Sequence, residues 1–205
     1  EVEPEWTLAL FLEELAALRE TLGLERVHLL GTSWGGMLAL EHALAHQETL
    51  HALVLSSTMA SAAEWEVEVK RLRDALGTDD EDEAMSRLAA RHIYRRDGEP
   101  SELRRMRAEP RAEVYEAMWG PNEWTVSGSL RGWDVRARLG EIQVPTLVLR
   151  GAHDLSTPAV ASTIVKGIPH AHEVVFAESS HMPVLEETER YLAAVREFLY
   201  AVEAR

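Results

Sequence analysis

The chain contains no cysteine, which removes several classes of chemistry. Disulfide bonds, thiolate zinc sites, iron–sulfur clusters and cysteine nucleophiles are all excluded. Basic residues are also scarce: 21 Lys and Arg stand against 35 Asp and Glu, for a net charge of −14. This balance argues against binding to nucleic acid or to an anionic membrane surface. No uncharged apolar run approaches the roughly 18 residues that a membrane span needs. We therefore expect no nucleic-acid partner and no membrane partner.

The remaining composition is that of a globular protein, with 46% hydrophobic and 27% charged residues. A length of 205 residues suggests one domain that carries an insertion. The sequence begins at Glu1 rather than Met and shows no signal peptide, so the cytoplasm is the default expectation for its location.

The first part of the chain has the pattern of a parallel α/β sheet. Apolar residues recur every three or four positions from Trp6 to Leu22, which predicts a helix capped by Thr7 and ended by Gly23. The next patterns predict a strand buried on both faces, a helix and a second strand, at 27–30, 37–44 and 50–55. Strand, tight turn, helix and strand in this order indicate parallel strands joined by crossover helices.

Residues 59–133 have a different character, because charged helical patterns dominate and no strand pattern appears. Helices are expected there over 64–76, 81–94, 101–106 and 111–119. Strand patterns return at 145–151 and 173–177, with helices near 159–167 and from about 186 onward. The sequence therefore predicts an α/β core formed by residues 1–58 and 134–205, interrupted by an all-helical cap at 59–133.

The pattern G-x-S-x-G, typical of a nucleophilic serine, occurs at Gly31-Thr32-Ser33-Trp34-Gly35. A predicted strand leads into it and a predicted helix leads out, which is the context that this motif requires. We expect the turn to hold Ser33 in a strained backbone conformation with its hydroxyl above the sheet edge. A side chain at either glycine would collide with the crossing strand and helix. The main-chain N–H of Trp34, at the helix N-terminus, is then placed to donate to an oxyanion.

A nucleophilic serine needs a general base and an acid that orients it, and in this class of sheet they follow in the order Ser, acid, His. Asp154 lies just past a predicted strand, where catalytic groups gather in parallel sheets. His181 lies between the last predicted strand and the last predicted helix. Of the nine histidines only His153 competes with it, and adjacency to Asp154 makes His153 a poor partner. The sequence predicts a triad of Ser33, Asp154 and His181.

Several segments resemble one family of enzymes over nearly the whole chain. They are Gly31 to Leu40, Gly120 to Thr125, Trp133 to Val135, Gly151 to Asp154, and Ser180-His181. The chain resembles the α/β-hydrolases of the proline iminopeptidase family, and most closely the tricorn-interacting aminopeptidase branch. The serine motif alone indicates only a hydrolase, whereas G-P-N-E ahead of W-D is typical of the branch. The resemblance implies an α/β-hydrolase fold with a helical cap.

The resemblance also implies an aminopeptidase that acts on short peptides with a free N-terminus and requires no metal or organic cofactor. Glu123 occupies the family's amine-binding position. A second glutamate follows the triad aspartate in the tricorn-associated branch, whereas Leu155 stands there in this chain. We therefore expect an amine subsite that is weaker, or completed by another acid of the cap. The cap tryptophans are candidates to line a pocket for a proline ring or another apolar side chain.

Relatives carry an H-G-G-P-G-type loop upstream of the serine, which supplies a second oxyanion N–H. The residues before Ser33 contain no such loop. From this comparison we expect the 205 residues to belong to a longer polypeptide, whose N-terminal segment holds the early strands of the sheet and completes the site.

Three functions stay open at this point. The first is a serine aminopeptidase that releases N-terminal proline or other apolar residues from short peptides. The second is an esterase or amidase that acts on small molecules with the same triad, which Leu155 favours. The third is a catalytically silent binding module, against which the intact triad residues argue. Labelling by a fluorophosphonate probe would separate the third function from the two enzymes.

Overall fold

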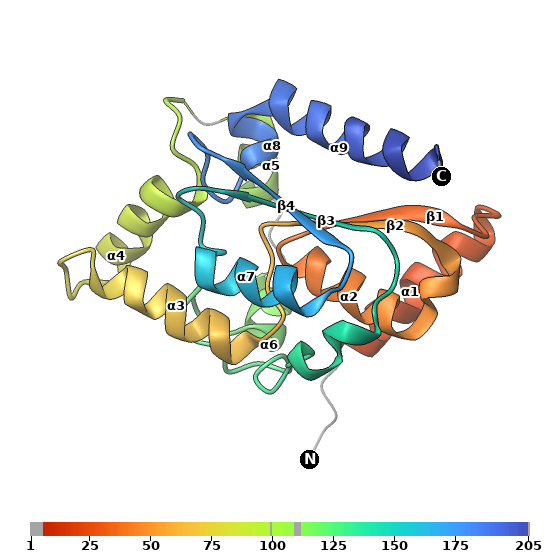
Figure 1. Ribbon diagram of the computed structural model, residues 1–205. Helices are drawn as coiled ribbons and strands as arrows, with labels where there is room; N and C mark the ends of the chain where they lie inside the picture. The colour runs from red at the N-terminus through yellow and green to blue at the C-terminus, as the bar shows by residue number, and fades with distance from the viewer. Residues whose placement is uncertain (1–5, 99, 109–111, 205) are drawn as a thin grey trace, which may run out of the picture.

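The computed structural model describes residues 6–98, 100–108 and 112–204 of the chain. At its centre is a parallel sheet with the strand order β1-β2-β3-β4 (Figure 1). The strands are β1 (Val27–Thr32), β2 (Leu50–Ser56), β3 (Thr146–Gly151) and β4 (Ala171–Phe176). Because all neighbouring pairs are parallel, the carboxyl ends of the four strands meet at one edge. This edge is where ligands bind in open parallel sheets.

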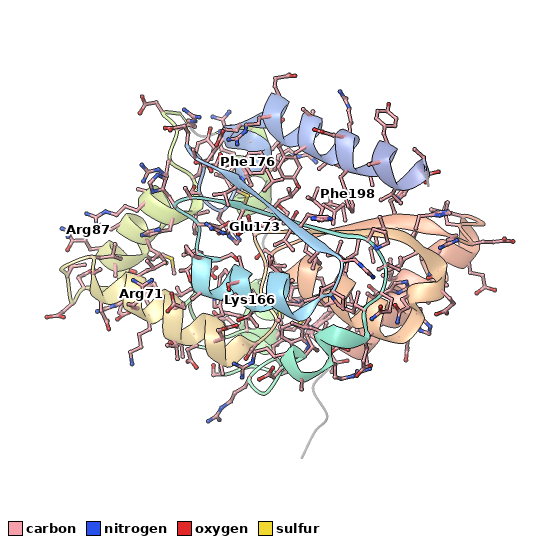
Figure 2. The ribbon with its side chains drawn as sticks, viewed as in Figure 1. Arg71, Arg87, Lys166, Glu173, Phe176 and Phe198 are labelled. Atoms are coloured by element: carbon pink, nitrogen blue, oxygen red, sulfur yellow. The ribbon has the colours of Figure 1, made fainter. Side chains whose placement is uncertain are left out.

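Helices cover both faces of the sheet (Figure 1). One face carries α2 (Trp34–His46) and α7 (Pro158–Gly167), which bury Leu40 and Ile164 against strand residues such as Leu53. The helix α1 (Leu8–Thr21) packs on α2. The other face carries α8 (Pro183–Glu186) and α9 (Thr188–Glu203). Figure 2 shows Phe176 and Phe198 in the apolar cluster on that side. The predicted α/β-hydrolase architecture, a parallel sheet flanked by helices, is confirmed.

Local signals placed α1 correctly. Thr7 caps the helix, since its hydroxyl oxygen accepts the N–H of Leu10 at 3.2 Å. Gly23 follows the helix with φ of 65°, a left-handed conformation that glycine adopts without steric cost. The expectation for the first strand was wrong in one respect, because β1 is not buried on both faces. It forms an edge of the described sheet, and Leu30 is 45% exposed.

The chain between β2 and β3 is helical among the described residues. It forms α3 (Ala62–Asp74), α4 (Glu81–Leu88), the π-helical turn η2 (Ala89–Ile93), α5 (Ser101–Ala108), α6 (Ala112–Met118) and the short 3-10 helix η3 (Arg136–Glu141). A further 3-10 turn, η1 (Gln47–Thr49), precedes β2. One apolar cluster joins Trp65 and Val69 of α3 to Leu88 of α4 and to Met37 of α2. The helical segment is therefore anchored directly above the N-terminal half of α2. Across the residues described, no helix is long and apolar enough to cross a membrane.

The chain enters and leaves this helical segment at a single point. The N–H of Ala62 donates to the carbonyl of Trp133 at 3.0 Å, and the N–H of Val135 donates to the carbonyl of Ala60 at 2.9 Å. The indole N–H of Trp133 also donates to Glu41 Oε1 at 2.8 Å. The W-D segment thus closes the base of the helical insertion and lies outside the site described next.

Candidate active site

Ser33 lies at the sharp turn between β1 and α2. Its backbone has φ of 53° and ψ of −119°, a conformation that costs a non-glycine residue about 1–3 kcal/mol. The predicted strain is therefore present. Two bonds hold the turn, one to β2 and one to the loop that follows it: Ser33 N–H donates to Ser56 O at 2.9 Å, and Thr58 Oγ1 donates to Ser33 O at 2.7 Å. Trp34 is the first residue of α2, where a main-chain N–H has no acceptor within the helix.

Glycines around the turn permit the close approach of strand and helix. A methyl group at Gly31 would overlap the backbone of Gly35 and Gly36, so that part of the prediction is correct. A methyl group at Gly35 would meet nothing within 4 Å, so the predicted collision there is wrong. The packing instead requires Gly36, whose added carbon would overlap the side chain of Thr58. The close contact between α2 and the loop after β2 is therefore at Gly36, one residue after the second glycine of the motif.

Asp154 and His181 lie on the loops that follow β3 and β4, at the same sheet edge as Ser33. The structure brings these two residues together, with 2.7 Å between His181 Nδ1 and Asp154 Oδ1. An ionised carboxylate only accepts, so Nδ1 carries the proton and Nε2 of the neutral ring has a free lone pair. Asp154 Oδ1 also accepts the N–H of Ser156 at 2.9 Å, and Oδ2 accepts that of Gly151 at 3.3 Å. These bonds fix a carboxylate whose side chain is fully buried.

The electrostatic surroundings of His181 favour its protonated form. Burial of the ring lowers its pKa, but the charge and hydrogen bond of Asp154, together with the charges of Glu123 and Glu186, outweigh burial and raise the pKa above its usual value. Within the described part of the chain, Ser33 and His181 share no hydrogen bond. Such catalytic contacts are often long in a free enzyme and shorten when substrate binds.

A cavity of about 370 Å³ opens in front of Ser33. Its walls are Phe11, Ser33, Trp34, Met37, Met59, Trp65, Val114, Tyr115, Met118, Trp119, Glu123 and Leu130. The tryptophans of this wall come from the serine turn, from α3 and from the end of α6. The ring of Trp65 meets the ring of Trp119 edge-on at 6.2 Å and that of His181 at 5.9 Å. Trp65 therefore connects the cavity wall to the imidazole of His181.

Glu123 reaches this wall from a tight turn after α6. Gly120 begins the turn with φ of 143°, a region that favours glycine. The side chain of Asn122 then accepts the N–H of Trp124 at 3.2 Å, which is a local bond typical of asparagine in turns. The carbonyl of Glu123 accepts the indole N–H of Trp65 at 3.2 Å. This turn carries the side chain of Glu123 to the cavity wall.

The carboxyl group of Glu123 has one hydroxyl partner. Tyr115 donates to its Oε1 at 3.1 Å. Burial raises the pKa of Glu123, an effect that His181 and the Tyr115 hydrogen bond reduce without cancelling. A nearby cation favours the ionised form of a carboxyl group and lowers its pKa, so an ammonium group bound here would oppose the effect of burial.

Leu155 fills the position where the second carboxylate of the related branch is expected. It is 1% exposed and belongs to the same apolar cluster as Trp65. Of the described residues that line the cavity, Glu123 is the one carboxylate. Among the described residues no other acid of the cap lines this wall, which is the first of the two expected alternatives, and the hydroxyl of Tyr115 lies beside Glu123.

Sequence reasoning did not identify Tyr115, nor the contacts of His92 with the loops of the predicted triad. Tyr115 lies in a helix whose polar pattern does not distinguish it from its neighbours. His92 lies in η2, and its carbonyl accepts the N–H of His181 at 3.0 Å. No local pattern could have found that contact, because the two residues lie 89 positions apart in the sequence.

Comparisons with known proteins agree with this geometry. Residues 3–188 match the family model for the alpha/beta hydrolase fold. The chain is 37% identical to a proline iminopeptidase of Clostridioides difficile, covering 93% of this chain and 72% of the relative. It is also 37% identical to that of Levilactobacillus brevis, covering 96% and 72%.

Solved structures give the same result. The structure of VinJ has 36% sequence identity and a TM-score of 0.89, over 98% of this chain and 75% of VinJ. A proline iminopeptidase of Mycobacterium smegmatis has 34% identity and a TM-score of 0.87, over 97% of this chain and 73% of that protein. The chain therefore belongs to the α/β-hydrolase-fold family and, within it, to the proline iminopeptidase group of serine hydrolases.

Proposed function

We propose that the protein is a serine aminopeptidase that releases N-terminal proline or another apolar residue from short peptides. One observation carries the proposal: Ser33 and the carboxylate of Glu123 line the same apolar cavity. A free ammonium group bound by Glu123 would place the first residue of a peptide in the cavity, with its carbonyl carbon next to Ser33. The names of the relatives support the same activity.

The proposed mechanism uses the predicted triad. Ser33 Oγ attacks the carbonyl carbon of the first peptide bond while His181 Nε2 takes the hydroxyl proton. Asp154 holds the tautomer that leaves Nε2 free and stabilises the imidazolium that forms. The N–H of Trp34 donates to the oxyanion. His181 then protonates the leaving amine, and water hydrolyses the acyl-enzyme by the reverse sequence of proton transfers.

In this proposal the helical segment limits the size of the substrate. Residues 59–133 act as a cap over the core of residues 1–58 and 134–205. The cap contributes Trp65, Trp119 and Glu123 to the cavity wall. A cap that closes the cavity behind the ammonium group admits only the end of a peptide, so exopeptidase rather than endopeptidase action is expected.

An esterase or amidase acting on small molecules is the second candidate, and Leu155 favours it. Its burial in the apolar cluster leaves Glu123 as the one carboxylate among the described residues of the wall. A weaker amine subsite would allow acyl groups without an ammonium to occupy the same cavity.

A substrate panel separates the two candidates. The full-length protein is assayed on three substrates: proline arylamide, its N-acetylated form and a short-chain nitrophenyl ester. The proposal predicts cleavage of the free proline arylamide, at least about 10-fold slower cleavage of the acetylated form, and loss of both in Ser33→Ala. Ser57→Ala is the matched control, because Ser57 also follows a strand with positive φ but is buried and lies outside the cavity wall. Equal cleavage of both arylamides would favour the second candidate.

A further inference from the structure

The end of η2 contacts both loops that carry the proposed acid and base. The N–H of His181 donates to the carbonyl of His92 at 3.0 Å. The ring of His92 reaches the other loop, with 2.8 Å between its Nδ1 and the carbonyl oxygen of His153, the residue before Asp154. A carbonyl only accepts, so Nδ1 of His92 donates this bond. One residue of the helical segment is thus bonded to the main chain on both sides of the His–Asp pair.

A buried glutamate forms the second contact between the same parts. Glu186, at the end of α8, is 7% exposed. Its carboxylate accepts the N–H of Ser180 at 2.7 Å, the hydroxyl of Ser180 at 2.9 Å and the N–H of Arg95 at 2.8 Å. The guanidinium of Arg96 donates to the carbonyl of Glu186 at 3.0 Å. Figure 1 shows the yellow-green chain after α4 running to α8, where these bonds form.

These contacts matter because they are made by the N–H of His181 and by Ser180, the residue before it. A buried carboxylate with three donors is costly to displace, and removing one partner leaves an unsatisfied group. Contacts with η2 and α8, and not the sheet alone, therefore fix the position of Ser180 and of the main chain at His181. The distance from His181 to Ser33 depends on the same bonds, since the two side chains share no hydrogen bond within the described structure.

We propose that His92 and Glu186 are positioning residues, which clamp the loops of Asp154 and His181 to the helical cap and set the reach of the imidazole toward Ser33. This inference rests on the triad of the proposed function. Neither residue lines the cavity. They act through the loops, so they are expected to affect turnover more than substrate binding.

The test compares two variants with two matched controls on proline arylamide and on the nitrophenyl ester. Glu186→Gln keeps the shape of the side chain, and His92→Phe keeps an aromatic ring but removes the donor to the His153 carbonyl. Glu189→Gln and His172→Phe make the same changes at exposed residues on α9 and β4. Both test variants are expected to lower kcat about 10- to 100-fold, as small misplacements of a catalytic group do, with KM changed by less than about threefold. The controls are expected to stay at the wild-type kcat.

The pH profile separates positioning from general loss of structure. Asp154, Glu123 and Glu186 are the carboxylates whose charges raise the pKa of His181. Glu186→Gln should therefore move the acidic limb of kcat to lower pH, whereas His92→Phe should lower kcat and leave that limb in place. If circular dichroism shows that Glu186→Gln does not fold, His92→Phe decides the question, because the ring of His92 is only half-buried.

Wild-type kcat in both test variants, or an equal loss in the control variants, would overturn the clamp. A rise in KM at unchanged kcat would overturn it as well. A wild-type protein that cleaves neither substrate and is not labelled at Ser33 by a fluorophosphonate would overturn the proposed function, and the clamp with it. Active wild-type protein with unaffected variants would overturn the clamp alone.

Discussion

Replacing Glu123 by glutamine removes the charge that the proposed amine subsite depends on while keeping the size of the side chain. Glu123 lies at the cavity wall with one hydroxyl partner, Tyr115, at 3.1 Å. Two unit charges about 4 Å apart attract by about 4 kcal/mol at an effective dielectric constant near 20. Desolvation of both groups reduces this, and a hydrogen bond to a charged group is worth about 1.5–3 kcal/mol net.

The expected loss of kcat/KM follows from this range of about 1.5–3 kcal/mol. A change of about 1.4 kcal/mol is tenfold in rate, so kcat/KM for proline arylamide should fall about 10- to 150-fold in Glu123→Gln. The nitrophenyl ester has no ammonium group, and its kcat/KM at pH 8 should change by less than about threefold. Glu116→Gln is the matched control, because Glu116 is exposed on α6 and lies outside the cavity wall.

The same variant has a second readout in the ester reaction. The charge of Glu123 raises the pKa of His181, so its removal should move the acidic limb of ester hydrolysis to lower pH. An equal fall in kcat/KM for the arylamide and the ester would refute the reasoning. It would show that Glu123 supports the structure of the site and does not bind the ammonium group. An unchanged arylamide kcat/KM would refute it too.

Other expected outcomes test the acid, the core and the serine turn. Asp154→Asn should lower kcat by about 10⁴-fold, as loss of the orienting acid does in a worked serine-protease case, and single-turnover assays with a control for contaminating activity would measure it. Burial is the main cause that lowers the pKa of His42 to about 4, below an unfolded value near 6.5, so the unfolded state binds the proton first as pH falls. The free energy of unfolding should therefore drop by up to about 3 kcal/mol between pH 6.5 and 4, and urea titrations of wild type and His42→Gln would isolate this share. Gly36→Ala should destabilise the fold by about 1–3 kcal/mol and Gly35→Ala by less than about 0.5 kcal/mol in the same titrations, and the reverse order would contradict the packing of the turn.

Much of the fold could be predicted because its determinants are local. The cap at Thr7, the glycine that follows α1 and the apolar runs of β2 and β3 all lie within one element. The burial of β1 could not be predicted, since an apolar run has the same pattern in a central strand and in an edge strand. Leu30 is exposed because of where β1 lies in the described sheet, which is a tertiary property.

The candidate site also combines features that the local sequence predicts with features that depend on tertiary packing. Chain order and strand ends were enough to expect that Asp154 and His181 meet, and they lie 2.7 Å apart. The pairing of Tyr115 with Glu123 and the roles of Gly35 and Gly36 depend on how helices pack, which no motif of five residues encodes.

The most direct test of the account is covalent labelling of the active nucleophile. The full-length protein is treated with a fluorophosphonate probe, digested and mapped by mass spectrometry, while proline arylamide hydrolysis is followed in the same samples. We predict one adduct, on the peptide that contains Ser33, formed in step with the loss of activity and absent in Ser33→Ala. An adduct on Ser57 in its place, or arylamide hydrolysis that survives complete labelling of Ser33, would contradict it.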